Sequence, residues 1–120
     1  MAQSVVVLEM DPKVAQYLAG GLRPHFNAVH VVASRDELRE KVSRSQPEAL
    51  VLDIEYGRLA DVETLHRDFP KLPIVCTHRI PDEELWMAAL EAGASDVCAA
   101  DDLSEVLTSV LRNVQLAKAA

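Results

Sequence analysis

The sequence predicts an α/β protein in which helices cover both faces of a parallel sheet, and three observations support this fold class. Short apolar runs alternate with amphipathic stretches at helical spacing. The runs are continuously apolar, which is typical of strands buried on both faces. The alternation occurs five times in 120 residues. Right-handed crossovers then place helices on both sides of the sheet.

Five apolar runs are expected to form the strands, because each has the length and composition of a buried strand. The last run is short and carries the weakest signal. The expected strands are Val5–Leu8, Ala28–Val32, Leu50–Ile54, Ile74–Thr77 and Asp96–Cys98.

The first two helices are marked by their start signals. Asp11 and Pro12 are an N-cap residue followed by proline at the first helical position. Ser34, with Glu37 three residues later, has the spacing of a capping box. The apolar faces of the two helices carry Val14, Leu18, Leu22, Leu38 and Val42.

The remaining three helices are marked mainly by apolar spacing and stop signals. A short third helix is expected over Val62–Asp68, ending before Pro70. The fourth begins near Pro81 and runs to Ala92, where Gly93 stops it. The fifth follows Asp101 and Asp102, and its apolar face carries Leu103, Val106, Leu107, Val110, Leu111 and Val114.

Composition indicates one globular domain over residues 1–120 with an aliphatic core. Apolar residues make up 49% of the chain and aromatic residues 4%, and this length needs no disulfide or metal for stability. The net charge of −7, from 12 basic and 19 acidic residues, argues against non-specific nucleic-acid binding by this domain. It is compatible with protein partners that carry basic patches.

The cysteines and the chain start indicate a reducing, cytoplasmic location. Cys76 and Cys98 lie within or at the end of apolar runs without metal-ligand spacing, which favours buried free thiols over a disulfide. No signal peptide is visible at the N-terminus, and no apolar run approaches the roughly 20 residues that a membrane helix needs.

Polar residues stand at the ends of three expected strands. Glu9, Asp53 and Thr77 follow the first, third and fourth apolar runs. The carboxyl edge of a parallel sheet is where open α/β folds bind their ligands. The three side chains therefore predict a phosphate and metal site at this edge.

Several strings, taken in order and spacing, resemble the receiver domain of two-component response regulators over almost the whole chain. They are Asp11-Pro12 after the first strand, the run from Pro47 to Asp53, Leu72-Pro73-Ile74-Val75 and, most specifically, the run from Ala89 to Asp96. The resemblance implies a flavodoxin-like (βα)5 fold with strand order 2-1-3-4-5. It also implies phosphorelay signalling.

By this resemblance, Asp53 is the position that accepts a phosphoryl group. Two adjacent acids after the first strand hold Mg²⁺ in the family, and they match Glu9 and Met10 here. Asp53 itself and the backbone carbonyl at Glu55 complete the implied metal ligands.

The resemblance assigns three further positions. A hydroxyl residue ends the fourth strand, and the apolar run places Thr77 there, whereas counting back from Gly93 would place His78. The lysine that ends the fifth strand is replaced by Ala100, and the aromatic switch position on that strand is Val97.

These departures predict a degenerate site, or pseudo-receiver. Mg²⁺ prefers hard oxygen ligands, and Met10 offers only a soft thioether, so Mg²⁺ binding is expected to be weak or absent. Ala100 removes a cation from a reaction that depends on positive charge around the phosphoryl oxygens. Whether Asp53 is nevertheless phosphorylated stays open.

Other residues near this edge offer partial replacements. Asp11 is expected to be an N-cap, with the alternative that it supplies the carboxylate that Met10 lacks. His78, Arg58 or Arg79 could supply the missing positive charge.

The expected function is signalling by protein–protein contact rather than catalysis. The expected surface is the family's face of fourth helix, fifth strand and fifth helix, where Trp86 and Met87 lie, and a histidine kinase or a downstream signalling protein is the partner. A homodimer through that face is possible. The alternative is a phosphorylation-competent receiver that uses Asp53 with weak Mg²⁺ binding. A more distant alternative is a small-ligand-binding or enzymatic flavodoxin-like domain, although no glycine-rich loop follows the first strand.

Overall fold

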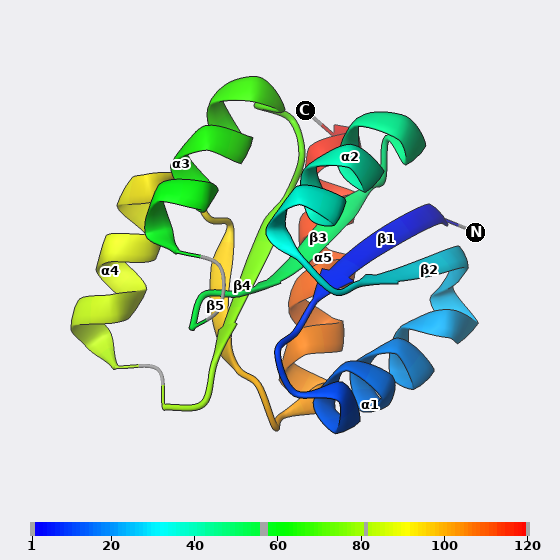
Figure 1. Ribbon diagram of the computed structural model, residues 1–120, viewed down its shortest axis with the longest axis horizontal. Coiled ribbons are helices and arrows are strands. Elements are labelled where there is room, and N and C mark those ends of the chain that lie inside the picture. The colour runs from blue at the N-terminus through cyan, green and yellow to red at the C-terminus, as the bar shows by residue number, and fades with distance from the viewer. Residues whose placement is uncertain (1, 56–57, 81, 120) are drawn as a thin grey trace.

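The computed structural model describes residues 2–55, 58–80 and 82–119. Its centre is a sheet of five parallel strands in the order β2-β1-β3-β4-β5, as predicted from the sequence (Figure 1). The strands are β1 (Ala2–Leu8), β2 (Phe26–Val32), β3 (Ala49–Asp53), β4 (Ile74–His78) and β5 (Asp96–Ala99).

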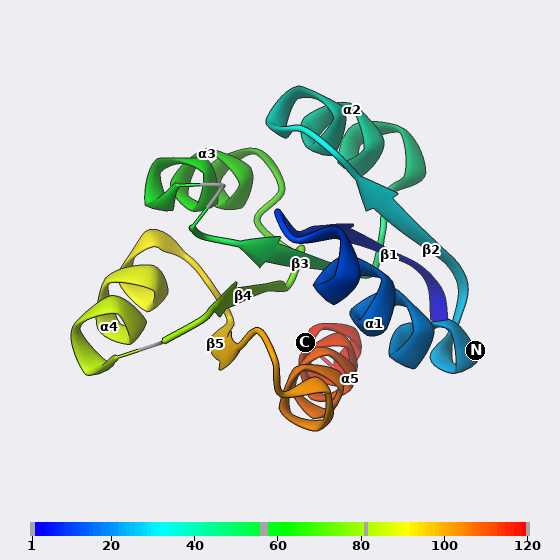
Figure 2. The same ribbon diagram turned by 60° about the horizontal axis from the view of Figure 1, so that its bottom comes forward.

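Helices cover both faces of this sheet (Figure 2). Two apolar cores result, because successive side chains of a strand point to opposite faces. One core lies under α2, α3 and α4, and the other lies under α1 and α5. The helices are α1 (Pro12–Leu22), α2 (Arg35–Ser45), α3 (Leu59–Asp68), α4 (Glu83–Ala92) and α5 (Leu103–Ala119), with a short 3₁₀ helix, η1 (Arg23–His25).

The predicted caps are present. The Asp11 side chain accepts a hydrogen bond from the backbone N–H of Lys13 at 2.9 Å. The Ser34 hydroxyl accepts from the N–H of Glu37 at 3.1 Å, and the Glu37 carboxylate accepts in turn from the N–H of Ala33 at 3.2 Å. These bonds satisfy donors at the helix starts that have no partner within the helix.

Several predicted strand ends differ from the structure by one to three residues: β1 begins at Ala2 rather than Val5, β3 at Ala49 rather than Leu50, β4 ends at His78 rather than Thr77, and β5 at Ala99 rather than Cys98. Three further differences concern β2, α3 and the end of β3. β2 begins at Phe26 rather than Ala28, because Phe26 already pairs in register with Ala2. α3 begins at Leu59 rather than Val62. β3 ends at Asp53, and Ile54 lies in the following turn. Pro81, the expected start signal of the fourth helix, lies outside the described residues, and α4 begins after the N-cap Asp82.

The two cysteines are buried free thiols, as expected. Cys76 belongs to the core under α2, α3 and α4, whereas Cys98 belongs to the core under α1 and α5. The sheet therefore separates the two thiols. Among the described residues, no helix is long and apolar enough to cross a membrane.

Candidate functional site

Asp53 lies at the carboxyl end of the central strand β3, with only 5% of its surface exposed. Its two carboxylate oxygens accept hydrogen bonds from two backbone amides. The N–H of Met10 donates to Oδ2 at 3.1 Å, and the N–H of Glu55 donates to Oδ1 at 2.8 Å. Two loops thus hold the carboxylate in one orientation, which is typical of a functional group rather than a solvated surface acid.

Glu9 follows β1 and lies beside Asp53. Burial, the negative charge of Asp53 and a hydrogen bond between the two side chains raise the pKa of Glu9 from 4.5 to about 8. A hydrogen bond from the Thr77 hydroxyl lowers the pKa of Glu9 but does not cancel these effects. Without a metal ion, Glu9 is therefore mostly protonated at neutral pH.

Thr77 adjoins this pair. It is fully buried, pairs in register with Asp53, and its hydroxyl donates to Glu9 Oε2 at 3.4 Å. His78, the other candidate for the hydroxyl position, turns its Nδ1 to the backbone N–H of Ile80 at 3.0 Å. The structure therefore brings together Glu9, Asp53 and Thr77, while His78 is the last residue of β4 and its ring turns to the loop that follows.

The positions that depart from the receiver pattern add neither charge nor a hard ligand. Met10 contributes its backbone N–H to Asp53, while the residue is 67% exposed. Ala100 is buried beside the end of β4, and its N–H donates to the carbonyl of His78 at 3.0 Å. Val97 is buried in the core under α2, α3 and α4. Within the described ranges, no basic side chain forms an ion pair with Asp53 or Glu9.

A charged cluster at the same edge escaped the sequence analysis. The Glu55 carboxylate accepts from the backbone N–H of Arg79 at 2.9 Å and from its Nε at 3.0 Å, and His78 Nδ1 lies 3.4 Å away. The Arg79 backbone hydrogen bond and the neighbouring positive charges hold the pKa of Glu55 below its usual range, although burial opposes them. Arg79, proposed as a surrogate cation for Asp53, is thus engaged with Glu55 instead.

A sequence signal for this cluster does exist. Asp53 and Thr77 lie opposite each other on neighbouring strands. Glu55 follows Asp53 by two residues and Arg79 follows Thr77 by two residues, so the same register brings Glu55 and Arg79 to the same level. The cluster could have been found once that register was assumed. Arg58, another surrogate candidate, donates its backbone N–H to Asp61 at 2.8 Å at the start of α3.

Fewer hard ligands stand at this edge than in the receiver pattern, because Met10 replaces an acid. Glu9 and Asp53 offer two adjacent carboxyl groups, and Asp11 is engaged as a helix cap. Among the described residues, no three His, Cys, Asp or Glu side chains are grouped to hold a metal ion. Mg²⁺ would need hard oxygen ligands in near-octahedral geometry. Glu9, Asp53 and the carbonyl at Glu55 are the groups that would have to supply them.

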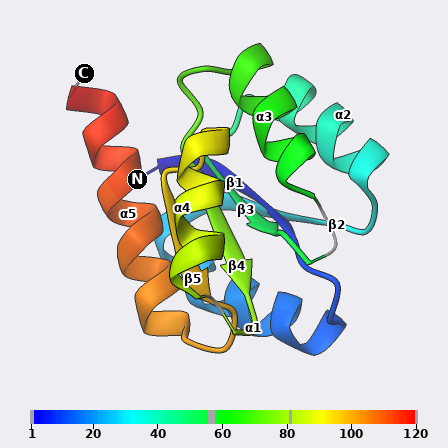
Figure 3. The ribbon, with the colours of Figure 1, turned by 90° about the vertical axis from the view of Figure 1, so that its left-hand side faces the viewer.

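The two apolar residues singled out in the sequence belong to α4, which lies near β5 and α5 in Figure 3. Trp86 is 43% exposed and Met87 is 51% exposed, both on α4. Asp96 at the start of β5 accepts from the Ser109 hydroxyl at 2.6 Å and from Arg112 at 3.1 Å. These bonds tie β5 to α5 and keep the face in one arrangement.

Comparison with known proteins by sequence gives one curated relative and no family model. The relative is a protein-glutamate methylesterase/protein-glutamine glutaminase of Syntrophotalea carbinolica, 29% identical over 128 aligned residues. The match covers 97% of this chain and 36% of the relative. The chain thus spans about a third of the length of that protein.

Comparison by structure gives receiver domains. The N-terminal receiver domain of a response regulator from Bacteroides fragilis superposes with a TM-score of 0.87 at 21% identity, covering 95% of this chain and 98% of that one. A putative response regulator from Chloroflexus aurantiacus gives 0.86 at 22%, covering 96% and 99%. NtrX from Brucella abortus gives 0.89 at 20%, covering 99% of this chain and 28% of NtrX.

The chain therefore has the flavodoxin-like fold of response-regulator receiver domains. Its strand order and its five flanking helices match those of these neighbours. At these identities, the likeness establishes the fold, and function has to be argued from the site.

Proposed function

We propose that residues 1–120 form a degenerate receiver domain, a signalling module that acts through protein–protein contacts and catalyses no reaction of its own. The observation that carries the proposal is the environment of Asp53. It is a buried carboxylate at the carboxyl end of β3, oriented by two backbone amides and adjoined by Glu9 and Thr77. This is the position of the phosphoacceptor in the family that the sequence resembles.

The degeneracy follows from the charge balance at this position. Phosphoryl transfer places additional negative charge on oxygens that must be met by cations or oriented donors. Here Met10 supplies no carboxylate ligand and Ala100 supplies no cation. We therefore infer weak or absent Mg²⁺ binding and a domain that remains largely in one state.

A second candidate is a phosphorylation-competent receiver with weak Mg²⁺ binding. The contact between Thr77 and Glu9 favours it, because a buried hydroxyl beside the acceptor can donate to an added phosphoryl oxygen. A structural neighbour, the DrrB receiver domain, is described as activated by BeF3, at 17% identity and a TM-score of 0.84. That probe therefore suits a test of the present site.

The proposed partners are a histidine kinase or a downstream signalling protein in the cytoplasm. The proposed surface is the α4–β5–α5 face, where exposed Trp86 and Met87 offer apolar contact area. Aromatic residues and methionine are enriched at the centres of protein interfaces. A homodimer through the same face belongs to this proposal. Binding of a small ligand, or an enzyme reaction, at the carboxyl edge of the sheet remains a more distant alternative.

The test is an amide NMR titration with Mg²⁺ followed by beryllofluoride. The degenerate reading predicts no site-specific shifts at millimolar Mg²⁺ and none after beryllofluoride is added. Saturable shifts at Asp53, Thr77 and α4, absent from the Asp53→Asn variant, would instead establish a working phosphoswitch. A parallel measurement of partner capture by wild type and by Trp86→Ala tests the proposed surface.

A further inference from the structure

A groove of about 720 Å³ lies between the carboxyl ends of α2, α3 and α5. The loops that line the groove lead into the amino ends of β3 and β4. The groove therefore lies at the opposite edge of the sheet from Asp53. Its volume falls within the range of small-molecule sites in proteins. The wall is mostly apolar and includes Val42, Pro47, Phe69, Leu72, Pro73 and Val114.

Glu48 lines this groove, and a hydrogen bond is present at one of its two carboxylate oxygens. Oε1 accepts a hydrogen bond from the backbone N–H of Gln3 at 2.7 Å. Oε2 is buried and has no hydrogen-bond partner. The Lys118 ammonium lies 3.0 Å from Oε2, which is a charge contact without hydrogen-bond geometry.

The Glu48 carboxylate is ionised despite its partial burial. Burial opposes ionisation, but the Gln3 hydrogen bond and the charge of Lys118 outweigh it and hold the pKa of Glu48 below its usual value. The groove therefore contains a negative charge whose Oε2 is paired with the Lys118 ammonium, and a cationic ligand would have to take the place of that ammonium.

The ends of the surrounding helices add to this negative potential. α2 ends at Ser45, α3 at Asp68 and α5 at Ala119, and residues from all three ends line the groove. The carboxyl end of a helix carries a partial negative charge, so it favours cations. Three such ends around one carboxylate favour a cationic occupant.

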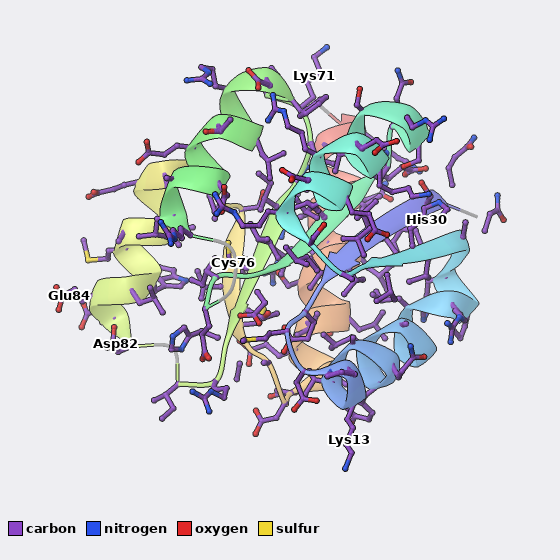
Figure 4. All side chains as sticks on the ribbon, viewed as in Figure 1. Lys13, His30, Lys71, Cys76, Asp82 and Glu84 are labelled. Atoms are coloured by element: carbon purple, nitrogen blue, oxygen red, sulfur yellow. The ribbon has the colours of Figure 1, made fainter. Side chains whose placement is uncertain are left out.

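The two lysines that line the groove leave room for a cationic ligand. Lys71 stands at the rim, where Figure 4 shows it projecting outward from the body of the protein. Lys118 comes from the next-to-last residue of α5, and its side chain is 54% exposed. An ion pair with such exposure is weak, so a ligand can displace the lysine at little cost.

We propose that this groove binds a small organic cation, an apolar body that carries a primary ammonium group. The ammonium donates to Glu48 Oε2 in place of Lys118, and the body packs between Phe69, Leu72 and Val114. This site is independent of the proposed signalling function, because it shares no residue with the Asp53 edge.

Two probes of similar shape and opposite charge test the proposed chemistry. NMR titrations of the full chain would compare 2-phenylethylammonium with 3-phenylpropanoate. The ammonium probe is expected to shift the amide signals of Val42, Leu72 and Val114 saturably, with a dissociation constant in the millimolar range. The carboxylate probe is expected to bind at least about tenfold more weakly. Equal or tighter binding of the carboxylate probe, or no saturable shift with either probe, overturns the proposal.

Three variants test the anchor. Glu48→Gln keeps an oxygen for the Gln3 N–H but removes the negative charge. It should weaken binding of the ammonium probe by about tenfold. Glu63→Gln makes the same change on α3, outside the residues that line the groove, and should leave the affinity unchanged. Lys118→Met removes the competing cation and should tighten binding by up to about fivefold. Full affinity in Glu48→Gln, or equal losses in Glu48→Gln and Glu63→Gln, would show that Glu48 is not the anchor.

Discussion

The side chains of Glu9 and Asp53 are hydrogen-bonded to each other at the carboxyl edge of the sheet, and their closeness keeps a proton on Glu9 at neutral pH. In the receiver pattern that the sequence resembles, this is a place for a metal ion. In the metal-free protein, protonation of Glu9 relieves the repulsion between the two carboxyl groups.

The Glu9 pKa makes stability depend on pH. Its value in the folded protein, about 8, lies above the ordinary value of 4.5, so the folded state binds a proton more tightly than the unfolded state. This contribution is fully present below about pH 4.5 and is lost as pH rises through about 8. We expect the free energy of unfolding to fall by about 1–2 kcal/mol over the upper part of this window, a figure reduced for solvent screening at a partly exposed carboxyl.

Urea unfolding followed by circular dichroism at several pH values measures this effect. Glu9→Gln should flatten the pH dependence, because glutamine does not titrate. Asp53→Asn should lower the Glu9 pKa, as read from the carboxyl carbon shift of Glu9, since it removes the neighbouring charge. Parallel stability curves for wild type and Glu9→Gln would rule out this role for Glu9.

Restoring the missing charges should restore a magnesium site. Met10→Asp adds a hard ligand beside Glu9, and Ala100→Lys adds a cation at the end of β5. We expect the double variant to bind Mg²⁺ at least about tenfold more tightly than wild type and to respond to beryllofluoride. Isothermal calorimetry measures both effects. A double variant that folds normally but gains no Mg²⁺ affinity would mean that the loops, rather than these two residues, disable the site.

The Glu55–Arg79 contact should order the loop after β4 without contributing much to global stability. The Arg79 side chain is 83% exposed, and exposed ion pairs contribute about 0–1 kcal/mol. Arg79→Ala should raise the pKa of Glu55 toward its ordinary value and speed amide exchange at Arg79 and Ile80. Arg67→Ala, which removes another exposed arginine, is the control and should change neither. Unchanged exchange in Arg79→Ala would mean that the backbone hydrogen bond alone holds the loop.

Two glycine substitutions should have opposite effects. Gly93 has φ of 116°, and a Cβ there would lie 2.5 Å from the His66 ring, so Gly93→Ala should destabilise the fold by about 1–3 kcal/mol. Gly20 lies within α1 with open space around it, so Gly20→Ala should stabilise by about 0.4–1 kcal/mol. Thermal unfolding measures both. Adding His66→Ala to Gly93→Ala should recover only the part of the steric loss that comes from the ring, because the His66 Cβ also lies 2.7 Å from the added Cβ.

Much of the fold was accessible from the sequence because its signals are local. Apolar runs, caps such as Asp11 and Ser34, and the stop at Gly93 each act within a few residues. The start of β2 was missed because it depends on pairing across the chain. Phe26 is a strand residue because it meets Ala2, which no local pattern reveals.

The candidate site was accessible in part for the same reason. Asp53, Glu9 and Thr77 each end an apolar run, and parallel strands bring such ends to one edge. The engagement of Arg79 with Glu55 required one further assumption, the register of β3 against β4, which puts each residue two positions beyond the Asp53–Thr77 pair. The protonation of Glu9 also depends on distances that a sequence does not contain.

The separation of Cys76 and Cys98 by the sheet gives this protein two natural reporters. Each thiol is sealed in a different layer, and burial raises the pKa of both to about 12. A thiol reagent can therefore modify Cys76 only when the layer under α2, α3 and α4 opens, and Cys98 only when the layer under α1 and α5 opens. The order in which the two react records which half of the molecule loosens first.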